Sequence, residues 1–214
     1  MRFSLRQQEA STLRRFLNTR WFQVPLGAVI LAVGVYLNDL ANRGRGGGNR
    51  PPTPPRANTS WTPFIWDEAG VEVEMPERPT RHNVSENAGD RRIPAIAYAS
   101  SAGCTTFTVV YVEYPADIPL SSDQDELLAK SMEWLAARRG EPGDTIETIE
   151  YRGHSGVEAL RTARMDDGRR VRARDRLFMF GRRAVIVGAV GDISDYDEEG
   201  ARRFFDSLRF AGEN

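Results

Sequence analysis

The chain has 214 residues, of which 29 are basic and 30 acidic, for a formal net charge of −1 at pH 7. Its one cysteine, Cys104, excludes an intrachain disulfide, and with it a small secreted fold held together by disulfides. Charge is distributed unevenly: residues 60–214 contain 20 basic and 28 acidic side chains, and residues 1–59 have a basic excess. An acidic domain of this kind argues against nucleic-acid binding.

The first predicted element is an apolar run over residues 21–37, which contains no charged residue. As a helix at about 1.5 Å per residue it is roughly 25 Å long, close to the thickness of a bilayer core. Trp21 and Tyr36 suit the membrane interface, and the arginine-rich segment before the run favours a cytoplasmic N-terminus. We predict a basic cytoplasmic tail over 1–20 and a transmembrane signal-anchor helix over 21–40, in contact with the lipid bilayer through its apolar run. A cleaved signal peptide and a buried core helix remain alternatives.

A linker is predicted over residues 41–60. Its first half is rich in glycine and its second half contains "PPTPP", which favours a flexible segment followed by an extended one. Because the linker has few apolar side chains to bury, we expect it to be disordered. It would hold the remaining residues, 61–214, away from the bilayer as an extracytoplasmic domain.

Several strands are predicted in this domain. "GVEVEMP" alternates between apolar and acidic residues up to Pro76, the pattern of a half-buried strand. "IPAIAYAS" and "TTFTVVYVEYP" predict two more strands, the second rich in β-branched and aromatic residues. "TIETIEYRG", "GVEALRTARM", "RRVRARDRLFMFG" and "AVIVGAV" continue the pattern, and "DDG" at 166–168 predicts a hairpin turn.

Two helices are predicted, over residues 121–140 and 194–210. Ser122 and Ser194 are each followed three residues later by an aspartate, which is the spacing of an N-terminal cap. The expected inward-facing residues are Leu127, Leu128, Ser131, Trp134 and Leu135 in the first helix, and Ala201, Phe204, Phe205 and Leu208 in the second. The order of elements predicts an α+β domain in which two helices cover a mainly antiparallel sheet.

A family resemblance rests on the strand "VEVEMPERP", the "YVEYP" strand before a long helix, and the closing "ARRFFDSLRF". Over about residues 65–211 these segments resemble the PsbP-like superfamily of extrinsic photosystem subunits, a nuclear-transport cofactor and bacterial envelope proteins. The resemblance implies an α/β/α sandwich with a non-enzymatic accessory role. It is carried by hydrophobic patterns, so no site residue of the family is transferred.

Nucleophilic chemistry is expected to be absent. A cysteine hydrolase needs a thiolate beside a histidine, and Cys104 and His154 are the candidate pair. Cys104 stands at the start of a predicted strand, where a lone cysteine is commonly buried. "GHSG" around Ser155 places its last glycine one position early for a nucleophile elbow, and its surroundings indicate strand, turn and strand.

Five carboxylates between Asp192 and Glu199 are the candidate ligands for a hard cation. The spacing of an EF-hand is absent, and helix capping explains most of these acids. A zinc site is not expected, because the two histidines, His82 and His154, are far apart in the sequence.

An aromatic cluster stands where the linker meets the domain, with Trp61, Phe64 and Trp66. We expect these side chains to plug one end of the core, and a patch facing the membrane or a partner is the alternative.

These observations predict a single-pass membrane protein with no cofactor, metal ligand or catalytic residue. Its extracytoplasmic domain is expected to be a non-catalytic binding or accessory module for a protein of the cell envelope. A domain that binds a divalent ion or small ligand is one alternative, and a Cys/Ser hydrolase is the other.

Overall fold

The computed structural model describes residues 60–88, 91–118, 120, 123–136, 143–164 and 168–212. The predicted tail and transmembrane helix, and all of the predicted linker except Ser60, lie outside the described residues. Neither α3 nor α4, the helices of the described part, combines the length and the apolar composition that a bilayer crossing requires.

The described residues form ten strands and two helices. In chain order these are β1 (Trp61–Trp66), β2 (Val71–Pro76), β3 (Thr80–Ala88), β4 (Arg91–Ala102), β5 (Thr105–Glu113), α3 (Gln124–Ala136), β6 (Thr145–Tyr151), β7 (His154–Arg164), β8 (Arg170–Phe180), β9 (Arg183–Asp192), α4 (Glu198–Ser207) and β10 (Arg209–Phe210).

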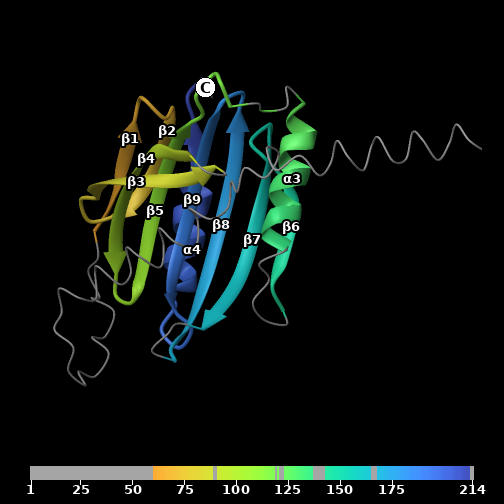
Figure 1. Cartoon of the computed structure of the whole chain (residues 1–214). Coiled ribbons are helices and arrows are strands. Elements are labelled where there is room, and N and C mark those ends of the chain that lie inside the picture. The colour runs from red at the N-terminus through yellow and green to blue at the C-terminus, as the bar shows by residue number, and fades with distance from the viewer. Residues whose placement is uncertain are drawn as a thin grey trace, which may run out of the picture.

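The strands form two antiparallel sheets (Figure 1). The large sheet has seven strands in the order β3-β4-β5-β9-β8-β7-β6, and the small sheet has three in the order β1-β2-β10. The large sheet consists of two meanders, β3 to β5 and β6 to β9, which meet where β5 pairs with β9. Between the meanders, α3 carries the chain from the middle of the sheet to its far edge at β6.

Both faces of the large sheet are buried over much of their area. On the α3 face, Leu127 and Leu128 of α3 pack against an apolar cluster that includes Val157, Leu177 and Ile186. The α4 face is covered by α4 and the small sheet. Because its two faces are both covered, β9 is buried from Ala184 to Val190 without the alternation of a half-exposed strand.

The prediction of an α+β domain with an α/β/α architecture is wrong. The described chain is mainly antiparallel β-sheet, with only α3 and α4 as helices. The small sheet shares the α4 face with α4, and α3 packs on β6, β7 and β8 rather than across the whole opposite face. Sequence reasoning overlooked β1, β3 and β10. It therefore predicted that helices alone cover the large sheet, whereas the small sheet forms part of that cover.

The start of α4 also differs from the prediction. Asp197 is the N-cap residue, and its Oδ1 accepts a hydrogen bond from Gly200 N at 2.8 Å. Glu198 and Glu199 follow in the first turn, where negative charge is stabilised by the helix dipole. Ser194 lies before the helix and its hydroxyl contacts Asp192 and Asp195 instead.

Candidate functional site

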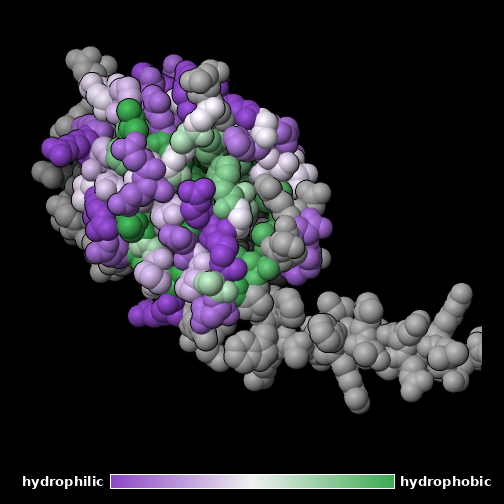
Figure 2. Space-filling model, turned by 90° about the horizontal axis from the view of Figure 1, so that it is seen from above, coloured by the Kyte–Doolittle hydropathy of each residue, from purple (hydrophilic) through white to green (hydrophobic). Residues whose placement is uncertain are grey.

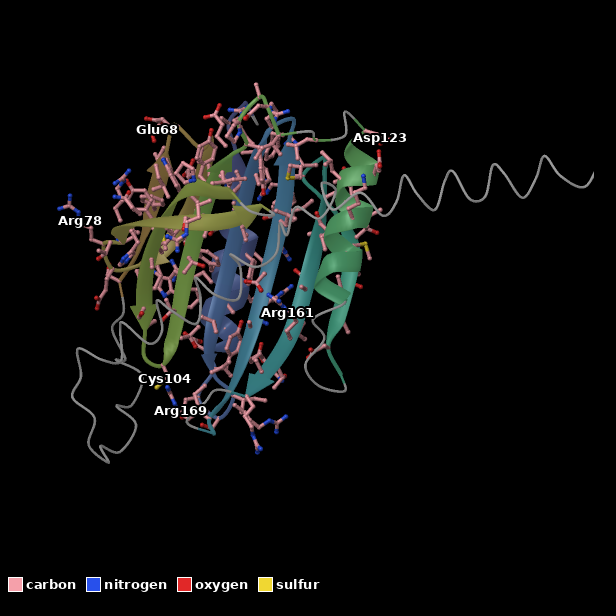
Figure 3. The ribbon with its side chains drawn as sticks, in the orientation of Figure 1. Glu68, Arg78, Cys104, Asp123, Arg161 and Arg169 are labelled. Carbon is pink, nitrogen blue, oxygen red and sulfur yellow. The ribbon has the colours of Figure 1, made fainter. Side chains whose placement is uncertain are left out.

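The candidate nucleophile and base, which were not expected to form a dyad, lie at opposite ends of the large sheet. Cys104 stands in the turn between β4 and β5, where Thr105 pairs with Gly191 at the end of β9 (Figure 3). His154 stands at the start of β7, and its ring packs against Phe180 at 5.2 Å between centroids, at the end where β9 begins. From Arg183 to Gly191 the strand extends roughly 26 Å at about 3.3 Å per residue. A Cys104–His154 dyad is therefore not formed.

Ser155 is not part of a nucleophile elbow either. Its Oγ lies 3.0 Å from Glu150 Oε2 across the β6–β7 hairpin. Arg152 and Gly153 form the turn of that hairpin with φ values of 51° and 76°, which matches the left-handed conformation of a two-residue turn. As the sequence indicated, the surroundings are strand, turn and strand.

The acidic residues near α4 have structural partners. Asp192 Oδ1 accepts from Ser194 N at 3.1 Å, and Asp197 caps the helix as described above. Glu198 pairs with Arg172. Within the described residues, no three His, Cys, Asp or Glu side chains come together in a way that could hold a metal ion. His82 lies on the edge strand β3, where burial lowers the pKa of its imidazole.

The aromatic residues of β1 belong to the core, as predicted. Trp66 is buried, with its ring 4.8 Å from that of Tyr98 and 5.8 Å from that of Tyr111. Trp61 meets the ring of Phe107 edge-on at 5.2 Å. These contacts attach the small sheet to the α4 face of the large sheet.

Sequence reasoning missed a buried ion pair on the α3 face. Arg161 of β7 and Asp175 of β8 are 2 % and 5 % exposed, and Arg161 Nη2 lies 2.6 Å from Asp175 Oδ2. Asp175 pairs in register with Ala159, and Arg161 with Ala173, so the two side chains are diagonal neighbours on one face. Arginine and aspartate are rarely this deeply buried unless they are paired.

Burial raises the pKa of Asp175, and the Arg161 guanidinium acts in the opposite direction. The Arg161 guanidinium thus offsets part of the cost of burying the charge of the Asp175 carboxylate. Removing one member would leave the other charge buried without compensation, which typically costs about 3–5 kcal/mol.

Arg161 has further hydrogen-bonding capacity that the described contacts do not use. Its Nε and Nη1 atoms are buried and have no hydrogen-bond partner. Leaving a buried donor unsatisfied costs about 1–3 kcal/mol, and more when the group is charged. The pair is therefore a costly feature if its only role is structural.

The residues around the pair are small or hydroxylated. Gly188 stands opposite Asp175 in the register, and a Cβ at Gly188 would lie 2.6 Å from Asp175 Oδ1 and 3.1 Å from Thr108 Oγ1. Glycine is therefore required for the aspartate to occupy this place. Thr108 lies on the same face, and its Oγ1 donates a hydrogen bond to Gly188 O at 3.3 Å.

An apolar cluster lies next to the pair on the same face. It consists of the buried Val171, Ala173 and Val190 with the partly buried Ala163. We call these four residues the lower cluster. Arg161 lies between Ala159 and Ala163 along β7, so it separates the lower cluster from the apolar residues beneath α3.

The α4 face carries arginine–carboxylate pairs whose donors are directed to several partners. Glu158 accepts from Arg174 at 3.0 and 2.9 Å and from Arg176 Nε at 2.6 Å. Both guanidinium groups stack on the ring of Phe205, at 4.8 and 5.0 Å. Arg176 Nη1 also donates to Phe205 O at 3.3 Å, near the end of α4.

Tyr151 completes the attachment of α4. Its hydroxyl lies 2.9 Å from Phe205 O and 3.1 Å from Leu208 O, among the carbonyls that an α-helix leaves without partners at its end. The arginines and the tyrosine of this face therefore have a structural role, which is to hold the end of α4 on the sheet.

One signal of the buried pair was present in the sequence. In "GVEALRTAR", alternate positions give Val157, Ala159, Arg161 and Ala163, which places an arginine among inward-facing apolar residues. The partner could not be found in this way, because its identity depends on the register between β7 and β8.

No family model matches the chain, and no curated protein is similar to it in sequence. A crystal structure from Bacteroides thetaiotaomicron resembles it with a TM-score of 0.42 and 10% identity, covering 71% of this chain and 48% of that one. The chain thus spans about half the length of that protein. A protein of unknown function from Pseudomonas aeruginosa has a TM-score of 0.34 and 13% identity, covering 63% of this chain and 85% of that one. Likenesses this weak carry no argument, and the PsbP-like resemblance stays a prediction.

Proposed function

We propose that the chain is a single-pass membrane protein whose β-sheet domain is a non-catalytic binding or accessory module for another component of the cell envelope. The N-terminus would be cytoplasmic and the domain extracytoplasmic. In this proposal residues 21–37 contact the bilayer, residues 41–60 act as a tether, and a protein of the envelope is the partner.

The junction at Ser60 and Trp61 is the observation that carries the proposal. The charge-free run and the Gly/Pro-rich segment precede it, and β1 begins at Trp61. Ser60 already belongs to the folded part, because its carbonyl accepts from Glu77 N at 3.0 Å. A folded domain that begins directly after a Gly/Pro-rich segment supports the proposal, because such a segment suits a domain that must reach a partner at a distance from the membrane.

The geometry disfavours the hydrolase alternative, because Cys104 and His154 lie at opposite ends of the large sheet. The surface is compatible with a partner. Hydrophobic residues are exposed among hydrophilic ones at the end of the domain seen from above (Figure 2). Among the described residues, Ile65 of β1 is the large hydrophobic side chain that is exposed, at 63%.

The single cysteine offers a test of the topology. In intact cells, a membrane-impermeant maleimide should label Ile65→Cys in a Cys104→Ser background, because Ile65 is 63% exposed. Labelling only after the membrane is permeabilised would place the domain in the cytoplasm and overturn the proposal. The Cys104→Ser chain without a new cysteine is the matched control.

The partner can be tested in the same cells with a photo-crosslinking residue at position 65 or 62, both of which are exposed. We expect one envelope protein to be recovered repeatedly in covalent linkage with the chain. A position that is buried, such as Val109, should give none. Recovery of the chain alone from every exposed position would contradict an accessory role.

A further inference from the structure

We propose that the free edge of β3 is a binding surface for an extended acidic segment of a partner protein, which would join the large sheet as a further strand. The inference deepens the proposed accessory role and rests on it in one respect, because it too takes the partner to be a protein. It does not depend on the membrane anchor. The surface is accessible, since Arg81, Asn83 and Ser85 of β3 are exposed.

Among the described strands, four have one edge without a partner strand, and β3 is the longest of them. They are β1 and β10 in the small sheet and β3 and β6 in the large sheet. β3 has nine residues, β6 has seven, β1 has six and β10 has two. The backbone N–H and C=O groups along such an edge can pair with a strand of another chain.

The other three edges have features that oppose the addition of an acidic strand. β10 offers only two residues for pairing, and β6 has two exposed glutamates, Glu147 and Glu150. In β1, Ser60 O accepts from Glu77 N, so the alternation of an antiparallel ladder directs the backbone of Pro63 to the free edge. Proline has no N–H to offer there. By contrast, β3 has no proline, and its exposed side chains in the described set are neutral or basic.

Exposed arginines at β3 indicate that the added segment is acidic. Arg78 lies just before β3, Arg81 belongs to β3 and Arg92 belongs to β4, and all three side chains are exposed. None of them forms an ion pair with a carboxylate of the described part of the chain. Figure 3 shows Arg78 directed away from the ribbon on the side of the domain where β3 begins. Carboxylates on a partner would complement these charges.

The register places two of these arginines on one face of the β3–β4 hairpin. Arg81 stands opposite Tyr98 on β4, and Arg92 lies an even number of residues from Tyr98, so both point to the same side. Asn83 Oδ1 accepts from Arg81 Nη1 at 2.8 Å, which holds the guanidinium on that side. Ile96 and Tyr98 are half-buried on the same face, and aromatic residues and arginine are enriched at protein interfaces. A partner residue directly opposite Arg81 would also point to this face.

An alternating acidic peptide is the probe for the test. It has nine residues, the length of β3, with glutamate and threonine in alternation and both ends blocked. We expect fluorescence anisotropy with the full-length chain in detergent to show saturable binding at about millimolar concentration or below. Affinity should fall as salt is raised, because the charges are exposed. A peptide with lysine in place of glutamate should bind at least about tenfold more weakly.

Backbone N-methylation separates strand pairing from general charge attraction. Two versions of the acidic peptide have methyl groups on all glutamate nitrogens or on all threonine nitrogens, so each loses the N–H groups of one edge and keeps its charge. We expect at least one version to bind at least about tenfold more weakly than the parent peptide. Hydrogen exchange should show new protection at β3 amides on binding and none at β6 amides.

Two double variants locate the surface. Arg78→Glu/Arg81→Glu should lower the affinity for the acidic peptide at least about tenfold. The matched control is Arg164→Glu/Arg202→Glu, which makes the same change of charge at exposed arginines of β7 and α4, and its affinity should stay within about twofold of the original. Circular dichroism establishes that each variant is folded. If the first variant does not fold, Arg78→Gln/Arg81→Gln serves instead, and unchanged affinity in that variant would contradict the inference.

Several results would overturn the inference: no binding of the acidic peptide, undiminished binding of both N-methylated versions, or an equal loss of affinity in the control variant. Self-association of the chain that protects β3 amides without any peptide would assign the edge to a second copy and would also overturn it. Recovery of an envelope protein by crosslinking at position 65 or 62, together with no peptide binding, would remove this inference alone and leave the accessory role in place.

Discussion

The two faces of the large sheet bury arginine beside carboxylate in different ways. On the α4 face, Arg174 and Arg176 share Glu158, stack on Phe205 and reach the end of α4. On the α3 face, Arg161 has Asp175, and two of its nitrogens have no partner. The first arrangement is explained by its role in holding a helix. The second leaves two buried donors without a partner among the described contacts, so its cost in stability is not offset in the same way.

The largest expected effect is that of Asp175→Ala alone. This change leaves the Arg161 charge buried without compensation, and we expect the free energy of unfolding to fall by about 3–5 kcal/mol. Urea unfolding of the full-length chain measures it. The double variant Arg161→Met/Asp175→Ala should recover most of the loss, and a double variant as unstable as the single one would refute the assignment of the cost to an unpaired charge.

Gly188→Ala should also destabilise the α3 face. The added Cβ would lie 2.6 Å from Asp175 Oδ1, so the ion pair or the strand must shift. We expect a loss of about 1–3 kcal/mol, typical of an overpacked core position. Combining Gly188→Ala with Asp175→Ala tests the cause, because the clash should then disappear and the two losses should not add.

Glu158→Ala should cost less than Asp175→Ala, although Glu158 pairs with two arginines. Arg176 keeps its bond to Phe205 O, and Arg174 is partly exposed and keeps its stacking contact. We expect a loss of about 1–2 kcal/mol in the free energy of unfolding, measured in the same way. A loss as large as that of Asp175→Ala would mean that the two faces do not differ as proposed.

Tyr151→Phe removes only the hydroxyl that bonds the carbonyls at the end of α4. The expected loss is about 1 kcal/mol. Tyr111→Phe is the control, because its hydroxyl contacts an exposed carboxylate, Glu113, at 3.4 Å and should contribute little. Equal effects of the two changes would show that the tyrosine does not secure the helix.

The smallest effect concerns His82 at the sheet edge. Burial lowers its pKa from the usual 6.5, so protonation is harder in the folded chain than in the unfolded chain. The contribution of His82 to stability is therefore present above pH 6.5 and is lost as the pH falls through its folded-state pKa. An NMR titration of the imidazole should have a midpoint below 6.5, and a midpoint above that value would contradict the shift.

Local patterns predicted the elements that carry a clear period. The alternation in "GVEVEMP" corresponds to β2, and the apolar face of Ala201, Phe204 and Phe205 corresponds to α4. β10 is two residues long and exists through its pairing with β2, and β3 is an edge strand of mostly polar residues. Neither has a period that could be recognised before its neighbours are known.

The candidate site was less predictable than the fold. Arg161 could be placed on an inward-facing position, but its partner is 14 residues away on the next strand, in a register that local reasoning does not give. The acidic residues at 192–199 are conspicuous in the sequence as candidate cation ligands. In the structure they form a helix cap and the turn before it.

The closure of both sheets by late segments has a consequence for biogenesis. β5 pairs with β9, and β2 pairs with β10, and both of these partners lie much later in the sequence. A polypeptide emerging N-terminus first would therefore expose the unpaired edges of β5 and β2 until β9 and β10 had been synthesised. Pairing between strands this distant in sequence slows folding, and the unpaired strand edges are prone to aggregation in the meantime. A growing chain of this protein would need a chaperone to cover these edges until β9 and β10 had been synthesised.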